Sequence, residues 1–132
     1  MKTEALDTNV LLRAVDSNRG EQTEAAVALL TDRARRFSVS LTALAEFVYV
    51  LSRHYSKERS AVAMLTRELI AADNIACDRN VIVPALDLYE THPKLSFEDC
   101  LIAEQARVEN AAPLWTFDAK LAKQHPIAKL VR

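Results

Sequence analysis

The feature that most constrains the fold is a junction in which a short apolar run ends at an aspartate and a helix begins at once. It occurs at Asp7, near the start of the chain, and again at Asp118, near its end. An aspartate at such a point caps the following helix by accepting hydrogen bonds from free backbone N–H groups. It also projects from the carboxyl end of a strand, where open parallel sheets place their binding sites. Taken alone, each aspartate fits both interpretations.

Short strand-like runs alternate with longer helical patterns along the chain. Strands are predicted at residues 3–7, 37–40, 74–77, 113–117 and 129–131, and helices at residues 8–15, 21–36, 41–55, 56–72, 78–91, 96–110 and 119–122. Such alternation predicts a parallel sheet with helices on both faces. Pro84 lies inside one predicted helix, where a proline ends or kinks it. With 132 residues, one α/β domain spanning residues 1–132 is expected.

Several function classes are excluded by composition. Gly20 is the only glycine, so the chain cannot build a P-loop or a Rossmann phosphate turn, which need several. The net charge of −1 gives no overall attraction to nucleic acid, so any phosphate binding must use a local patch or metal ions. Cys77 and Cys100 lack the spacing of a zinc site and are predicted to be buried thiols in a reducing cytoplasm. No apolar run is long enough to span a membrane, and the N-terminus has no signal-peptide core, so we expect a soluble cytoplasmic protein.

Glu46 is the most informative single residue. Every other residue from Ala43 to Leu51 is apolar, and a helix that is apolar on nearly all sides is predicted to be buried. A buried carboxylate is costly unless it is paired, hydrogen-bonded or bound to a metal. The alternative is that Glu46 lies at the rim of the helix and reaches water.

A further acid, Asp99, opens the helix predicted at residues 96–110. Ser96 and Asp99 have the spacing of a capping box, which is the structural interpretation of this acid. Its neighbour Glu98 competes with it for any functional role. In a parallel sheet with this order, Asp7, Glu46, Asp99 and Asp118 can all face the edge formed by the carboxyl ends of the strands. Converging carboxylates stay ionised only if cations offset their charge, and all-oxygen ligands favour Mg²⁺ or Mn²⁺ over zinc.

Basic side chains have two open interpretations. Arg13, Lys120 and Lys123 follow the acidic junctions and are candidates for contacts with phosphate groups, although solvated helix charges explain them equally well. Arg33, Arg35 and Arg36 end a predicted helix, where positive charge complements the helix dipole.

Four blocks carry a family resemblance over nearly the whole chain. They are Leu6-Asp7-Thr8-Asn9-Val10-Leu11-Leu12-Arg13, Leu44-Ala45-Glu46, Ser96-Phe97-Glu98-Asp99-Cys100-Leu101-Ile102-Ala103, and Trp115-Thr116-Phe117-Asp118-Ala119-Lys120-Leu121. No block is specific alone, but all four in this order and at these intervals resemble a PIN domain, and more narrowly the VapC-type toxins of toxin–antitoxin pairs.

The resemblance implies a three-layer α/β/α fold with a short parallel sheet of four or five strands. It implies a Mg²⁺- or Mn²⁺-dependent endoribonuclease whose metal is held by Asp7, Glu46, Asp99 and Asp118, with Thr8, Asn9 and Thr116 as supporting groups. A water with a lowered pKa would attack phosphorus, leaving a 5′-phosphate and a 3′-hydroxyl. A cognate antitoxin and a homodimer formed through the N-terminal helices are implied as partners. His54, His92 and His125 lie outside the motifs, which disfavours a histidine-based ribonuclease.

Three rival interpretations remain. A phosphatase with an aspartate nucleophile also opens on a strand and an aspartate, but it needs D-x-D, and Asn9 stands at the third position. A phospho-acceptor receiver domain needs an adjacent acid pair after the first strand and a lysine after a late strand, and neither appears here as required. A catalytically silent PIN-like module that binds RNA or protein is the third; the acids at all four positions argue against it.

Overall fold

The computed structural model describes residues 2–132, so Met1, the first residue of the predicted domain, lies outside the described part. The chain forms two compact units, Met1–Asp78 and Arg79–Arg132. The single domain over residues 1–132 stays a prediction. Across residues 2–132, seven helices and five strands are present, and every strand pairing is parallel. The predicted α/β class is therefore confirmed.

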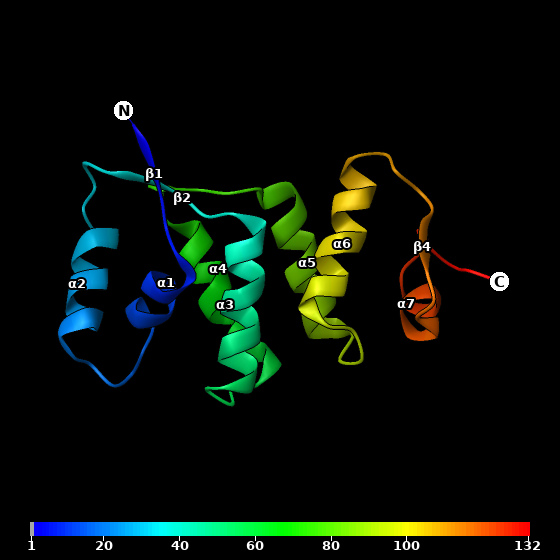
Figure 1. The fold of residues 1–132 in the computed structure, drawn as a ribbon, viewed down its shortest axis with the longest axis horizontal. Helices are drawn as coiled ribbons and strands as arrows, with labels where there is room; N and C mark the ends of the chain where they lie inside the picture. The colour runs from blue at the N-terminus through cyan, green and yellow to red at the C-terminus, as the bar shows by residue number, and fades with distance from the viewer. Residues whose placement is uncertain (1) are drawn as a thin grey trace. The chain divides into compact units, whose positions relative to one another are not determined.

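The first unit contains a three-stranded parallel sheet and four helices. Its elements are β1 (Thr3–Ala5), α1 (Thr8–Ala14), α2 (Glu21–Leu30), β2 (Arg36–Ser38), α3 (Leu41–Arg53), α4 (Arg59–Ala71) and β3 (Ile75–Ala76). The strand order is β1-β2-β3, with Glu4 opposite Phe37 and Phe37 opposite Ile75. Helices α3 and α4 run side by side, and α1 contacts both α2 and α3 (Figure 1).

The core of the first unit is made by one apolar stripe from each helix. Leu11 and Leu12 of α1, Ala26 of α2, Leu44, Phe47, Val48 and Leu51 of α3, and Val62, Ala63 and Ile70 of α4 are buried, together with Phe37 of β2 and Ile75 of β3. Spacings of three and four residues place each set on one side of its helix. Burial of these stripes, rather than helix propensity, supplies most of the stability of such short helices.

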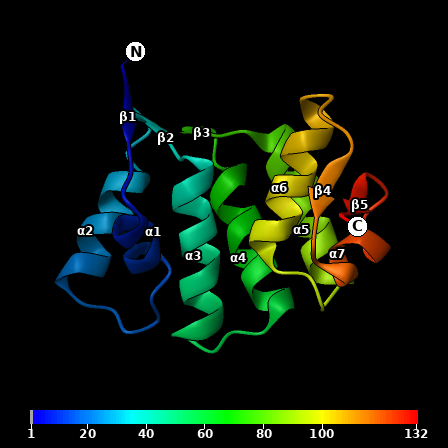
Figure 2. The same ribbon diagram turned by 45° about the vertical axis from the view of Figure 1, so that its right-hand side comes forward.

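The second unit contains two packed helices and a small parallel sheet. Its elements are α5 (Arg79–Thr91), α6 (Phe97–Val108), β4 (Leu114–Thr116), α7 (Ala119–Gln124) and β5 (Ala128–Leu130). Trp115 of β4 lies opposite Lys129 of β5. Figure 2 shows α5 and α6 side by side, with α7 next to the two strands. Pro84 lies inside α5, but the helix continues to Thr91, so the proline does not end it.

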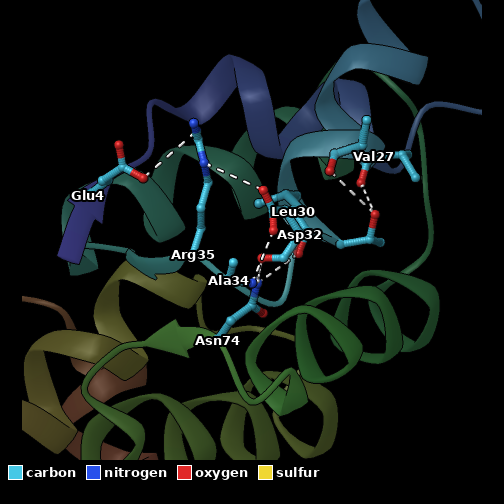
Figure 3. Close-up of polar contacts among 9 residues, drawn as sticks. Glu4, Val27, Leu30, Asp32, Ala34, Arg35 and Asn74 are labelled. Atoms are coloured by element: carbon cyan, nitrogen blue, oxygen red, sulfur yellow. Dashed lines mark hydrogen bonds and ion pairs between the residues drawn. The ribbon is translucent and has the colours of Figure 1, made fainter. Parts of the chain in front are cut away.

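Two local predictions were wrong at helix ends. The second predicted helix stops at Leu30 instead of running to Arg36, so Arg33, Arg35 and Arg36 do not lie in its last turn and do not complement its dipole. Arg35 instead pairs with Glu4 of β1 at 3.8 Å and with Asp32 at 3.6 Å (Figure 3). The fourth helix, predicted to begin at residue 56, begins at Arg59 with Glu58 as its N-cap residue.

The buried Asn74 explains why the chain turns after α2. Its side-chain amide donates to the carbonyl oxygen of Leu30 at 2.9 Å, and so joins the end of α2 to the start of β3 (Figure 3). The Asn74 amide thereby supplies a donor to one of the carbonyl groups that a helix end leaves unsatisfied. The cysteines differ in burial: Cys100 is buried as expected, and Cys77 is only partly buried. No helix among residues 2–132 is long and apolar enough to cross a membrane.

Candidate functional site

Asp7 occupies the predicted junction between the first strand and the first helix. It is the N-cap residue of α1, in extended conformation with φ −79° and ψ 152°, yet its side chain makes no capping hydrogen bond. The side chain is exposed. The capping interpretation therefore does not account for this carboxylate, which stays available to a ligand.

Glu46 is exposed, and the prediction that it is buried was wrong. The buried residues of α3 form one stripe, Leu44, Phe47, Val48 and Leu51, and Glu46 lies off it. Tyr49, three residues further along, is also half exposed. Residues three apart share a helix face, so Glu46 and Tyr49 belong to the side of α3 that reaches solvent. This apolar run therefore forms a helix with one buried side and one solvent-facing side, and not a helix that is buried on all sides.

Thr8 connects the two acids of the first unit. It is 5% exposed, and its hydroxyl donates to the carbonyl oxygen of Ala43 at 3.3 Å. Ala43 lies one turn before Glu46 in α3. The hydrogen bond fixes the start of α1, where Asp7 lies, against the first turns of α3, where Glu46 lies. Thr8 supports the arrangement through the backbone of α3 and not through a carboxylate.

In the second unit, Asp99 lies in the first turn of α6. Ser96 is the N-cap residue, and its hydroxyl oxygen accepts from the Asp99 backbone amide at 3.1 Å. This is one half of the capping box. Among the described residues, no hydrogen bond of the Asp99 carboxylate completes the other half. Asp99 is half buried and Glu98 is exposed.

Asp118 is the N-cap residue of α7 and uses part of its carboxylate for that purpose. Its Oδ1 atom accepts from the amides of Lys120 at 2.9 Å and Leu121 at 3.4 Å. Its own amide donates to the Thr116 hydroxyl oxygen at 2.9 Å. Thr116 therefore fixes the backbone of Asp118, while the second carboxylate oxygen is left for another ligand.

The other proposed residues lie near these junctions. Asn9 is exposed and, with Arg13, lines a hollow of about 290 Å³ between α1 and α2. Arg13 forms an ion pair with Asp16 at 3.4 Å, so its positive charge is partly offset and less available to a phosphate group. Lys120 and Lys123 are exposed on α7.

The sequence reasoning missed one buried acid, Glu104 of α6. Its Oε2 atom lies 2.6 Å from Nε2 of His125, and its Oε1 atom accepts from Arg107 at 2.7 Å. His125 Nδ1 accepts from the Ile127 amide at 3.2 Å, so the ring proton is on Nε2 and points to the carboxylate. Burial alone would raise the pKa of Glu104, but the hydrogen bonds from His125 and Arg107 hold it below its ordinary value. The pair joins α6 to the segment between α7 and β5.

A signal for Glu104 was present in the sequence. Glu104 follows Cys100 by four residues and Leu101 by three, and both are buried. A residue at these spacings lies on the core face of the helix. The partner, His125, is 21 residues away and carries no local signal of its own.

The proposed ligands fall in two pairs, Asp7 and Glu46 in the first unit and Asp99 and Asp118 in the second. Within either unit, among residues 2–132, no three His, Cys, Asp or Glu side chains gather at a metal-binding spacing. The chemistry of the donors nevertheless fits Mg²⁺ or Mn²⁺. All four are carboxylates with oxygen atoms available, which hard divalent cations prefer.

Comparison with known proteins gives one family. The model of the PIN domain matches residues 5–125, which covers most of both compact units and includes all four acids. No curated protein matches the chain. Because the match covers far more than half of the sequence, the chain belongs to the PIN domain family.

Proposed function

We propose that the chain is a divalent-metal-dependent endoribonuclease and the toxin of a toxin–antitoxin pair. PIN domains are generally nucleases that bind divalent metal ions, and they typically act on nucleic acids. The observation that carries the proposal is the family match together with acids at all four motif positions: Asp7, Glu46, Asp99 and Asp118. The toxin role is supported by the resemblance of the motif blocks.

In this proposal the four carboxylates hold Mg²⁺ or Mn²⁺. A bound ion supplies charge that offsets the scissile phosphate and a water activated for attack on phosphorus. The chain's own groups keep the ligands in place. The bond between Thr8 and Ala43 secures the start of α1, and Thr116 secures the backbone that carries Asp118. Supporting bonds of this kind reduce the motion of carboxylates that must not shift during the reaction.

The proposed partners follow from the same resemblance. The substrate is RNA, the inhibitor is an antitoxin that covers the four carboxylates, and two copies of the chain associate through their N-terminal helices. The protein would act in the cytoplasm, where its RNA targets are. The hollow between α1 and α2, which Asn9, Val10 and Leu29 help to line, is compatible with a contact at these helices.

The test is cleavage of a labelled RNA with Mn²⁺, with and without EDTA. Asp7→Asn is expected to lower the rate by more than about a hundredfold, because losing even an outer partner of a metal site costs up to about a hundredfold. The matched control is Asp73→Asn, since Asp73 is a fully exposed aspartate of the same unit. Cleavage that survives both EDTA and Asp7→Asn would refute the metal-nuclease proposal. RNA binding without any cleavage would favour the silent module.

The toxin role needs a separate test in cells. Induced expression of the wild-type chain is expected to arrest growth, and expression of Asp7→Asn is not. Co-expression of a cognate antitoxin is expected to restore growth by masking the four carboxylates. Normal growth with an RNA-cleaving wild-type chain would leave the nuclease assignment intact and refute the toxin role.

A further inference from the structure

A basic hollow lies at the edge of the first unit's sheet where the strands begin. It has a volume of about 430 Å³, and its lining residues are Arg33, Arg35, Arg36, Asp73 and Asn74. Arg36 is the first residue of β2, and Asn74 directly precedes β3. Asp7 follows the other end of β1, at the start of α1. Because these strands are parallel, the hollow and Asp7 lie at opposite edges of the sheet. We call it the arginine hollow.

Two arginines of the arginine hollow keep their N–H groups free for a ligand. Arg35 lies 3.8 Å from Glu4 and 3.6 Å from Asp32 (Figure 3). Both distances exceed the separation of about 2.7–3.2 Å that a hydrogen bond requires. Arg36 is exposed and makes no ion pair with any residue from 2 to 132. A guanidinium group carries several N–H donors in a planar fork, so both side chains can donate to an anion.

The third arginine, Arg33, is only weakly held. Its nearest acid is Asp73 at 4.0 Å, and the two side chains are 68% and 98% exposed. An exposed pair at this separation contributes little to stability and is easily exchanged for a ligand. The arginine hollow therefore offers three guanidinium groups, and the one acid that lines it is almost fully in solvent.

Asn74 adds an acceptor of fixed orientation. Its side-chain nitrogen donates to the carbonyl oxygen of Leu30 at 2.9 Å, which identifies Oδ1 as the acceptor atom (Figure 3). The residue is only 7% exposed, and within the described chain Oδ1 has no hydrogen-bond partner. Buried polar atoms in folded proteins nearly always have one. A donor from outside the chain would complete this residue, and Asn74 lines the arginine hollow.

We propose that the arginine hollow binds a small phosphate monoester that also carries a hydroxyl group. The planar forks of arginine match the oxygen atoms of phosphate, and three of them favour a doubly charged group. The hydroxyl donates to Oδ1 of Asn74. The volume is within the range of small-molecule sites, so an organic group fits beside the phosphate. This inference is independent of the proposed nuclease, because none of the four carboxylates lines the hollow.

A bound molecule would connect two separate segments of the first unit. Arg33 and Arg35 lie between α2 and β2, whereas Asn74 lies between α4 and β3. A ligand that contacts both segments binds the folded chain and not the unfolded one. Binding is therefore expected to raise the melting temperature as the ligand concentration rises above its dissociation constant.

The experiment titrates glycerol 3-phosphate into the full chain by isothermal titration calorimetry. EDTA is present so that no metal ion at the carboxylates can bind the phosphate. We expect saturable binding and a rise in melting temperature. Propyl phosphate keeps the carbon chain but lacks the hydroxyl groups, so it is expected to bind about fivefold more weakly for the loss of one neutral hydrogen bond. Absence of binding, or equal affinity for propyl phosphate, would overturn the proposal.

Succinate tests whether the site prefers phosphate over carboxylate. It carries two negative charges, but on separate carboxylates and without a hydroxyl group. It is expected to bind at least about tenfold more weakly than glycerol 3-phosphate, because it lacks the donor to Asn74 and cannot bring both charges to one point. Equal affinity would make the arginine hollow a carboxylate site and refute the phosphate assignment.

Substitutions assign the binding to this hollow. Arg36→Gln is expected to weaken glycerol 3-phosphate binding at least about tenfold, the effect of losing one hydrogen bond to a charged group. Arg33→Gln, outside any helix or strand, is expected to do the same and tests the site without altering β2. The matched control is Arg19→Gln, because Arg19 is an exposed arginine of the same unit that pairs with Glu24 and does not line the hollow. Wild-type affinity in both Arg33→Gln and Arg36→Gln would refute the proposal.

Removing the acid of the hollow has the opposite expected sign. Asp73→Asn releases Arg33 and removes a negative charge, so the affinity for glycerol 3-phosphate should rise by up to about fivefold. A lower affinity would contradict an anion site. RNA cleavage by the same variants separates the two proposals: phosphate binding in a chain that does not cleave RNA would refute the nuclease alone, and cleavage in a chain that does not bind phosphate would refute the arginine hollow alone.

Discussion

Replacing Glu104 tests whether the buried carboxylate–imidazole pair stabilises the second unit. In Glu104→Ala, the Nε2–H group of His125, whose side chain is only 2% exposed, is left without its acceptor. An unsatisfied buried donor costs about 1–3 kcal/mol, and a hydrogen bond from a neutral group to a charged carboxylate contributes about 1.5–3 kcal/mol. The Arg107 side chain is 49% exposed, so its ion pair adds less than about 1 kcal/mol. The expected loss in the free energy of unfolding is about 3 kcal/mol.

The conservative variant Glu104→Gln separates charge from hydrogen bonding. Its amide oxygen still accepts from His125, so the expected loss at neutral pH is only about 1 kcal/mol, the difference between charged and neutral hydrogen bonds. The pKa of Glu104 is lowered in the folded state, so the charge stabilises the fold above the ordinary value of 4.5. This contribution is lost as the pH falls through the folded-state pKa. The difference between wild type and Glu104→Gln should therefore be constant from pH 7 to 6 and shrink below pH 4.5.

The assay is urea unfolding of both variants and wild type at a series of pH values. The control is Glu98→Gln, an exposed acid of the same helix, for which we expect a change below about 1 kcal/mol. The reasoning is refuted if Glu104→Ala costs no more than the control. It is also refuted if the advantage of wild type over Glu104→Gln grows as the pH falls below 4.5.

Two further predictions concern hydrogen bonds that fix helix starts in the site. Ser40 caps α3 by accepting from the Ala43 amide at 3.1 Å, so Ser40→Ala should lower the unfolding free energy by about 1 kcal/mol and Ser40→Asp by much less, as measured by urea unfolding. Thr8→Val removes the bond to the Ala43 carbonyl and should cost about 1 kcal/mol, while Thr8→Ser keeps the hydroxyl and should restore most of it; equal stability of the valine and serine variants would show that this bond contributes nothing.

Helix phase explains both errors about charged residues. In α3 the buried residues include Leu44, Phe47 and Leu51, which lie on one side of the helix. Glu46 lies on the side that faces solvent. In α6 the buried positions Cys100 and Leu101 are followed by Glu104 on the same side. The number of apolar residues around Glu46 predicted that it is buried, and the same criterion gave no prediction for Glu104. Counting positions along the helix would have predicted both correctly.

The sequence by itself determined the α/β class, the approximate span of most helices and strands, and the positions of Asp7 and Asp118 as N-cap residues, because local patterns of apolar and capping residues set these features. It also carried the family resemblance that the PIN match supports. Only tertiary structure decided that Glu104 meets His125, that Arg35 pairs with Glu4, and that Asn74 closes the end of α2. These contacts join residues distant in the chain, so their partners depend on how whole elements pack and not on any neighbouring residue. The exposure of Trp115 and Phe117, just before Asp118, is of the same kind, since a run of apolar letters does not say which side chains are covered.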